Sequence, residues 1–196
     1  MKDFYTRKSR EEGYYARSAY KLKQINKKYN IIKKGDEVLD LGCSPGGWIQ
    51  ASLEIVSKNG YVMGIDIVNV KKIEAKNFEF IKSDIHKTDL KRNFDAVLSD
   101  MAPRTTGMRD LDQERSYDLA KQALETAKKH LKSGGNFLCK IFQGPKYNEF
   151  MKEVRKNFEF IKTVKPKASK KQSKEMYVVG KCMKPKKEKY ILTKNI

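Results

Sequence analysis

The sequence lacks any apolar run approaching the roughly 20 residues that a membrane-spanning helix requires. Its opening, Met-Lys-Asp-Phe-Tyr-Thr-Arg-Lys, also lacks the apolar centre of a secretory signal peptide. These absences predict a protein without a membrane partner that works in the cytoplasm, although the sequence does not separate the cytoplasm from an organelle or the nucleolus.

Cysteine and histidine are scarce. Cys43, Cys139 and Cys182 are odd in number and far apart, so neither a disulfide framework nor the paired spacing of a zinc site is present. His86 and His130 are isolated from each other. We therefore expect reduced thiols and no metal.

Acidic residues are few beside basic ones, with 24 Asp and Glu against 43 Lys and Arg and a formal net charge of +19. This balance predicts a polyanionic partner, nucleic acid before a membrane, although a lysine-rich composition alone would give the same charge. The length suits a single domain over 1–196, with a basic N-terminal segment at 1–15 and a lysine-rich tail at 185–196. The first part of the chain mixes arginines with tyrosines, which can hold phosphates and stack on RNA bases.

The strongest local pattern is Glu-Val-Leu-Asp-Leu-Gly-Cys-Ser-Pro-Gly-Gly-Trp at 37–48. A short apolar run ends in glycine, and apolar and small residues follow over 48–56, so the stretch predicts a strand, a tight turn and a helix. Gly42, Gly46 and Gly47 would let a ligand approach the main chain closely at the helix N-terminus.

The spacing G-x-x-P-G-G in this turn differs from the dinucleotide fingerprint G-x-G-x-x-G. Pro45 inside the turn and Asp40 before it suit a ligand with a positive or amino-bearing group better than a bare pyrophosphate. S-adenosylmethionine, with its sulfonium and amino-acid tail, fits that description. The alternative is a turn that merely joins a strand to a helix.

Apolar runs alternate with helical periodicity along the chain, which predicts an α/β fold built on a doubly wound parallel sheet. No helix separates the last two strands, so these should pair antiparallel. A polar loop is expected at 104–112 and a mobile, lysine-rich loop at 165–174. The expected strands are 38–41, 61–65, 78–81, 94–99, 137–140, 158–164 and one beginning at 175, and the expected helices are 15–29, 48–56, 119–131 and 147–156.

Charged residues end several of these strands, where an open α/β sheet binds its ligands. Asp66 ends the second strand and could hold ribose hydroxyls, and Asp84 in the next such loop could accept a bond from an adenine amino group. Asp100 and Lys140 end neighbouring strands, where a lysine is costly unless it is paired or used. The alternatives are an ordinary surface aspartate and an ordinary ion pair at the rim of the sheet.

Four short motifs, in this order, resemble the FtsJ-like family of RNA ribose 2'-O-methyltransferases, and the similarity runs from Ala16 to about Lys184. The resemblance implies a Rossmann-like class I methyltransferase fold, with a seven-stranded, mostly parallel sheet, an antiparallel last strand and helices on both faces. The matching motifs are Asp40-Leu41-Gly42 with Pro45-Gly46-Gly47-Trp48, Ser99-Asp100-Met101-Ala102-Pro103, Lys140-Ile141-Phe142-Gln143-Gly144 and Ser173-Lys174-Glu175-Met176-Tyr177.

The resemblance also implies which residues carry the activity. The family's catalytic tetrad of lysine, aspartate, lysine and glutamate falls on Lys21, Asp100, Lys140 and Glu175. Contacts with S-adenosylmethionine are implied at Gly46, Trp48, Asp66, Asp84 and Asp100, and the open glycine turn adds Gly42.

Methyl transfer to a ribose hydroxyl requires alignment of the reacting atoms and removal of a proton from a poor acid. We expect Lys140 to be the base, which requires its neutral form, and a second cation at Lys21 together with partial burial would favour that form. Asp100 and Glu175 pull the other way and are assigned to orienting the lysines and the ribose. The pattern leaves open whether Lys140 accepts the proton or mainly steers the hydroxyl.

The nearest family members act on a uridine of large-subunit ribosomal RNA, and the compact chain resembles those; other relatives modify transfer RNA or messenger caps. A non-catalytic RNA-binding factor for ribosome assembly is a further alternative, which the intact turn and tetrad argue against. A nicotinamide-dependent oxidoreductase is disfavoured by the glycine spacing and by the charge. Basic segments flank the first and last tetrad residues, so we expect RNA affinity to fall steeply with salt.

Overall fold

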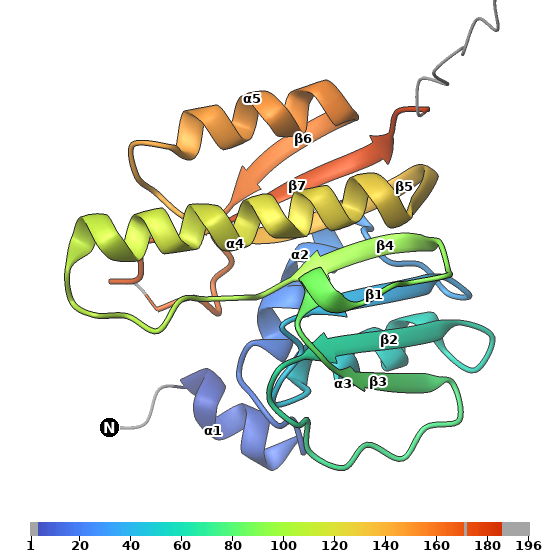
Figure 1. Ribbon diagram of the computed structural model, residues 1–196. Helices are drawn as coiled ribbons and strands as arrows, with labels where there is room; N and C mark the ends of the chain where they lie inside the picture. The colour runs from blue at the N-terminus through green and yellow to red at the C-terminus, as the bar shows by residue number, and fades with distance from the viewer. Residues whose placement is uncertain (1–3, 171, 186–196) are drawn as a thin grey trace, which may run out of the picture.

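A computed structural model describes residues 4–170 and 172–185 of the chain (Figure 1). The predicted lysine-rich tail, apart from its first residue, lies outside the described residues. In the part of the chain that the structure describes, no helix has both the length and the apolar character of a membrane span.

The strands form one seven-stranded sheet in the order β3-β2-β1-β4-β5-β7-β6. Six strands run parallel, and β7 runs antiparallel to both of its neighbours, β5 and β6. The predicted Rossmann-like sheet with an antiparallel last strand is therefore confirmed. The strands are β1 (Glu37–Leu41), β2 (Tyr61–Asp66), β3 (Phe78–Lys82), β4 (Phe94–Ser99), β5 (Leu131–Phe142), β6 (Phe158–Val164) and β7 (Glu175–Met183).

Helices cover both faces of the sheet, as Figure 1 shows. On one face α4 (Arg109–His130) and α5 (Tyr147–Asn157) pack on Leu39, Leu41 and Phe137; on the other, α2 (Ala19–Tyr29) and α3 (Gly47–Val56) pack on Val38, Val62 and Leu98. The central strands are buried on both sides, which explains why they read as nearly continuous apolar runs.

The N-terminal region differs from its prediction in two ways. A helix, α1 (Phe4–Glu11), precedes the predicted one, and α2 begins at Ala19 instead of residue 15. Only Ser9 of α1 is buried, so this helix lacks the broad apolar stripe that would reveal it in the sequence.

The region after β4 also differs. The helix α4 begins at Arg109, inside the predicted loop. The Asp112 carboxylate in its first turn accepts bonds from the backbone nitrogen and hydroxyl of Thr106 at 2.8 and 3.0 Å, which holds the preceding loop against the helix. Its C-terminal end is His130, and the Ser-Gly-Gly stretch predicted to stop it lies in β5, within a shift of register against β4. A short 3-10 turn, η1 (Ile85–Lys87), follows β3.

The strand order reverses between β1 and β4, which lie side by side at the centre of the sheet. Ligands of open α/β sheets bind outside the carboxyl ends of the strands at such a point. Gly42 follows β1 and Asp100 follows β4, so the fold brings the glycine turn and the strand-end aspartate to the same place.

Candidate active site

A pocket of about 560 Å³ opens at this switch point. Gly42 lies in its wall with a φ of +70°, and a Cβ there would collide with the side chain of Met101. Glycine is therefore needed both for the backbone conformation and for the close approach of the two loops. A cavity of this size is typical of sites for small molecules and cofactors.

Three carboxylates line the pocket: Asp66, Asp84 and Asp100. Asp66 also fixes the glycine turn, because its Oδ2 accepts a bond from the backbone nitrogen of Ser44 at 2.8 Å. Asp84 accepts a bond from the backbone nitrogen of His86 at 3.0 Å and so begins η1. Each carboxylate keeps further lone pairs for a ligand, and the acidic lining suits a ligand that is cationic or rich in hydroxyl and amino groups.

Two predicted cofactor residues lie outside the lining of this pocket. A Cβ on Gly46 would meet the side chains of Ile73 and Tyr15 at 3.0 and 3.3 Å, so these two residues cover the turn. The ring of Trp48 is buried, and its Nε1 donates a bond to the carbonyl of Ser18 at 2.8 Å. The indole thus joins α3 to the start of α2, and any contact of Trp48 with a ligand would use its backbone.

The four residues of the predicted tetrad converge beside the pocket from four different elements. Lys21 comes from α2, Asp100 follows β4, Lys140 lies in β5 and Glu175 begins β7. Lys21 Nζ lies 2.6 Å from Glu175 Oε1, and Lys140 Nζ lies 2.9 Å from Asp100 Oδ1. Lys140 also donates a bond to the backbone carbonyl of Asp100 at 2.5 Å. The result is a cluster of two lysine–carboxylate pairs.

Tyr177, which the sequence analysis did not single out, joins the two pairs. Its hydroxyl donates a bond to Asp100 Oδ1 at 2.6 Å and accepts one from Lys21 Nζ at 3.1 Å. It lies directly opposite Lys140 in the β5–β7 pairing, so the two side chains share a face of the sheet. Burial first, and then the carboxylates of Asp100 and Glu175, raise the pKa of Tyr177 well above its ordinary value. The hydroxyl therefore keeps the proton that it donates.

The cluster is largely removed from solvent. The exposed fractions of Lys21, Lys140 and Glu175 are 8%, 7% and 9%, and Tyr177 is fully buried. Two cations and two anions balance one another, which is the condition under which buried charges are tolerated. Asp100 is more open and also lines the pocket, so it connects the cluster to the ligand site.

Asp40 lies beneath the glycine turn and is fully buried. Neither of its carboxylate oxygens has a hydrogen-bond partner among the described residues. Burial raises the pKa of Asp40 well above the ordinary value, and the nearby charges of Asp100 and Asp66 raise it further. An unpaired buried carboxyl of this kind is stable only in its protonated, neutral form.

Comparison with known proteins shows the family to which the chain belongs. The profile of the FtsJ-like methyltransferase family matches residues 14–183, most of the chain. The chain belongs to this family. The FtsJ-like match includes all four members of the charged cluster, the three carboxylates of the pocket and Tyr177.

Individual relatives agree with this assignment. The FtsJ-like chain is 44% identical over 193 residues to the ribosomal RNA large subunit methyltransferase E of Methanothermobacter thermautotrophicus, covering 94% of this chain and 92% of that protein. It is 42% identical over 185 residues to the protein of the same name from Desulfatibacillum aliphaticivorans, covering 91% and 89%.

A solved structure is similar as well. The crystal structure of a Plasmodium falciparum protein assigned as a ribosomal RNA methyltransferase superposes with a TM-score of 0.78 at 29% identity, over 88% of this chain and 100% of that one. An S-adenosylmethionine-dependent O-methyltransferase of Thermotoga maritima, at 14% identity and a TM-score of 0.59, shares the fold over 86% of this chain and 67% of that chain.

No group of three or more His, Cys, Asp and Glu side chains that could hold a metal ion occurs in residues 4–170 and 172–185. Burial raises the pKa of the thiols of Cys43 and Cys139, so both stay protonated beside the site.

Proposed function

We propose that this FtsJ-like methyltransferase transfers a methyl group from S-adenosylmethionine to a ribose 2'-hydroxyl of RNA, on a uridine of large-subunit ribosomal RNA. The observation that carries the proposal is the double position of Asp100, which lines the cofactor-sized pocket and contacts Lys140 and Tyr177 of the charged cluster. A ligand in the pocket would thus lie against the group that holds the proposed base.

The residues of the pocket fit S-adenosylmethionine. Asp66 and Asp84 can accept bonds from hydroxyl and amino groups, and Gly42 leaves the main chain open. The three carboxylates, with Asp100 among them, complement a ligand with a positive sulfonium and ammonium. When bound, S-adenosylmethionine would supply an electrophilic methyl group, whose sulfur leaves as a neutral thioether when an oxygen takes the methyl.

We assign to Lys140 the removal of the 2'-hydroxyl proton. Its pair with Asp100 favours the charged ammonium, so Lys140 must first release a proton before its neutral Nζ can accept the hydroxyl proton as the oxygen attacks. Asp100 would orient Lys140, since it binds the lysine through both its side chain and its carbonyl. Lys21 and Glu175 would hold the ribose beside that base. Tyr177 would fix the two lysine–carboxylate pairs relative to each other, since its hydroxyl bonds one member of each. Fixing the hydroxyl in an attacking geometry is itself a large part of such catalysis.

Two observations support an RNA substrate: the names of the relatives and the positive charge of the protein. Arg7 and Lys8 of α1 pair with Glu11 and Glu12, four residues later, at 3.6 and 3.5 Å on the surface. Exposed pairs of this kind are weak, so phosphates can replace the carboxylates. The net charge of +19 would draw RNA toward the protein, and ribosomal RNA as substrate would place the enzyme with cytoplasmic ribosomes.

The test is transfer of labelled methyl from S-adenosylmethionine to undermodified large-subunit ribosomal RNA, to assembled large subunits, to transfer RNA and to capped messenger RNA. We expect label on ribosomal RNA or the subunit. Label on transfer RNA or the cap alone would contradict ribosomal RNA as the substrate but would be consistent with methyl transfer to RNA. Cofactor binding without transfer to any of the four would contradict the enzyme and favour a ribosome-assembly factor.

A further inference from the structure

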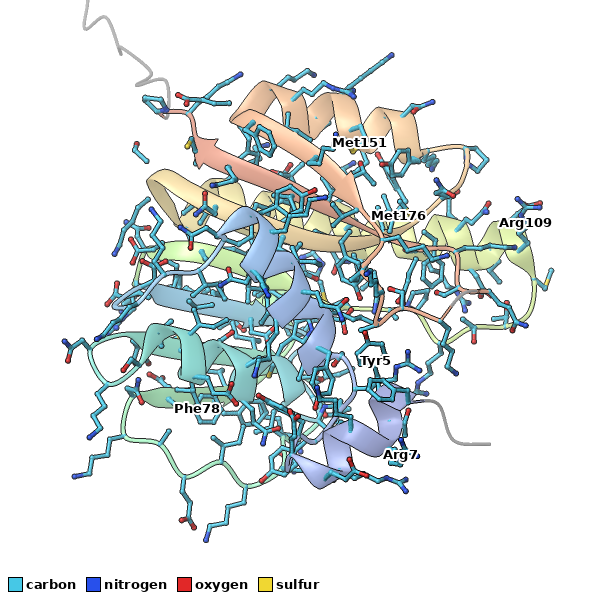
Figure 2. The ribbon with its side chains drawn as sticks, turned by 180° about the vertical axis from the view of Figure 1, so that it is seen from behind. Tyr5, Arg7, Phe78, Arg109, Met151 and Met176 are labelled. Carbon is cyan, nitrogen blue, oxygen red and sulfur yellow. The ribbon has the colours of Figure 1, made fainter. Side chains whose placement is uncertain are left out.

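A second cavity, of about 580 Å³, lies between the C-terminal half of α2 and the connection from β6 to β7. It shares no lining residue with the cofactor pocket. Ile25 and Tyr29 of α2 line one side, and Val164 and Pro166 line the other. Figure 2 shows α2 lying across this face of the sheet, with the connection after β6 running beside it. We call this cavity the α2 groove.

The wall of the α2 groove is fixed by specific contacts. Gln24, which lines the groove, accepts a bond from the backbone nitrogen of Ala168 at 3.0 Å and donates one to the hydroxyl of Tyr5 at 2.9 Å. Arg17 donates a bond to the carbonyl of Ala168 at 2.5 Å, and Ala168 is fully buried. The connection predicted to be mobile is thus docked on α2 at this point.

Aromatic surface is available at the end of the α2 groove. The rings of Tyr29 and Phe160 pack with centroids 6.5 Å apart, and 45% of Phe160 remains exposed. Tyr29 is half-buried, and Lys28 Nζ lies 5.3 Å from the centre of its ring, so lysine charge and aromatic surface meet here. Aromatic faces of this kind are the platforms on which proteins stack unpaired bases, and they accept any base.

The charge of the α2 groove has one sign. Lys27, Lys28, Lys165 and Lys167 are exposed among its lining residues, and no Asp or Glu lines it in the part of the chain that the structure describes. Lys162 lies on the same face of β6 as Phe160 and Val164, because residues two positions apart in a strand point to the same side. Lysines alone would be a solvated surface, but lysines around an apolar and aromatic floor match both parts of a nucleotide, its phosphate and its base.

We propose that the α2 groove binds a single-stranded RNA segment that flanks the methylated nucleotide, with a base stacked at Tyr29 and Phe160 and phosphates on the surrounding lysines. The inference deepens the proposed function and rests on it. Tyr29 lies eight residues after Lys21 on α2, about 12 Å along the helix at 1.5 Å per residue, so one strand can reach the groove and the site together. The groove thus selects substrates with unpaired nucleotides beside the target ribose.

The experiment measures RNA affinity for groove variants and for a variant matched in charge. Phe160→Ala removes the exposed ring, and Lys27→Glu with Lys28→Glu reverses two groove charges. Lys58→Glu with Lys91→Glu makes the same charge change at two exposed lysines outside the groove. The probe is a labelled single-stranded RNA of about 12 nucleotides, a length within the usual site sizes of single-strand binders, beside a duplex of the same length.

We expect Phe160→Ala to weaken binding of the single strand by about 5- to 150-fold, the range for loss of stacking on one aromatic ring, and to leave duplex binding within twofold. Log affinity falls with log salt, and the Lys27 and Lys28 reversal should make this fall less steep by about 1.4, since each single-strand phosphate contact contributes about 0.7 to the steepness. The Lys58 and Lys91 control should change the single-strand affinity and its salt dependence less. A 4-thiouridine in the single strand should crosslink to Tyr29 or Phe160, which tests the placement without any substitution.

Equal weakening in the groove and control variants, with no crosslink at the two rings, would show bulk charge only and overturn the inference. A Phe160→Ala defect limited to assembled ribosomal subunits would assign the groove to a protein partner and overturn it as well. If the wild type transfers no methyl to RNA while the groove variants still lose single-strand binding, the proposed function fails and the groove remains an RNA site.

Discussion

Removal of one hydroxyl, in Tyr177→Phe, tests whether the two lysine–carboxylate pairs work as one unit. The substitution keeps the buried ring and deletes the group that donates to Asp100 at 2.6 Å and accepts from Lys21 at 3.1 Å. Asp100 would keep its pair with Lys140, and Lys21 would keep its pair with Glu175. Each buried charge therefore retains one partner, and only the bridge between the pairs is lost.

The expected cost is about 2 kcal/mol, because a hydrogen bond to a charged group contributes roughly 1.5–3 kcal/mol and both charged partners stay paired. For a protein of this size that loss lowers Tm by about 4–8 °C. If the bridge also positions Lys21 and Asp100 for catalysis, kcat should fall about tenfold, the equivalent of about 1.4 kcal/mol in the barrier. KM for S-adenosylmethionine should change less, since the aspartates of the pocket are untouched.

The assay combines thermal unfolding with steady-state methyl transfer, and Tyr61→Phe is the matched control. The Tyr61 hydroxyl also binds a carboxylate, that of Glu79, but does so on the exposed surface. We expect this control to change Tm by less than about 2 °C, as is typical of surface substitutions. A Tyr177→Phe protein with the Tm and kcat of the wild type would refute a bridging role for the hydroxyl.

Three further perturbations test other parts of the site. Lys140→Arg keeps the positive charge but cannot accept a proton, so we expect kcat to fall at least 100-fold, as far as in Lys140→Ala; substantial activity in the arginine variant alone would assign Lys140 to steering the hydroxyl. Asp66→Ala should weaken S-adenosylmethionine binding at least tenfold by calorimetry, because it removes a pocket carboxylate and the bond that fixes Ser44; unchanged affinity would exclude Asp66 from the cofactor site. Asp40→Asn should raise Tm relative to the wild type by an amount that grows from pH 5 to pH 8. The pKa of the native Asp40 carboxyl is raised, so the folded protein holds a proton that the unfolded chain releases above roughly pH 4. The stability of the wild type therefore falls as the pH rises, whereas an asparagine does not titrate. A Tm difference independent of pH would contradict a neutral Asp40.

The position of the site could be predicted from local sequence. The glycine turn follows an apolar run, and Asp100 and Lys140 end two more, so parallel pairing of these strands brings all three to one edge. The roles of Lys21 and Glu175 came from the family resemblance. The structure places both within the cluster. Lys21 is buried there, although it does not belong to the apolar stripe of α2.

The features that escaped prediction depend on contacts between distant segments. Tyr177 meets Asp100 only because β7 pairs with β5 in a register that sets it opposite Lys140, and register is not encoded within either strand alone. The docking of Ala168 on Gln24 likewise joins residues 144 positions apart. Few apolar residues mark α1, and the first turn of α4 is polar, with Asp112 bonded back to Thr106 in the preceding loop, so periodicity predicts neither start.

The most direct test of the central claim maps the methyl group on the RNA. A 2'-O-methyl ribose lacks the hydroxyl that attacks the neighbouring phosphate in alkali, so the modified position resists hydrolysis. Undermodified large-subunit ribosomal RNA would be treated with S-adenosylmethionine and either the wild type or Lys140→Ala, hydrolysed and sequenced. The account predicts one new alkali-resistant uridine position with the wild type and none with the variant. Methyl groups that appear on bases, or an equal yield from the Lys140→Ala protein, would contradict it.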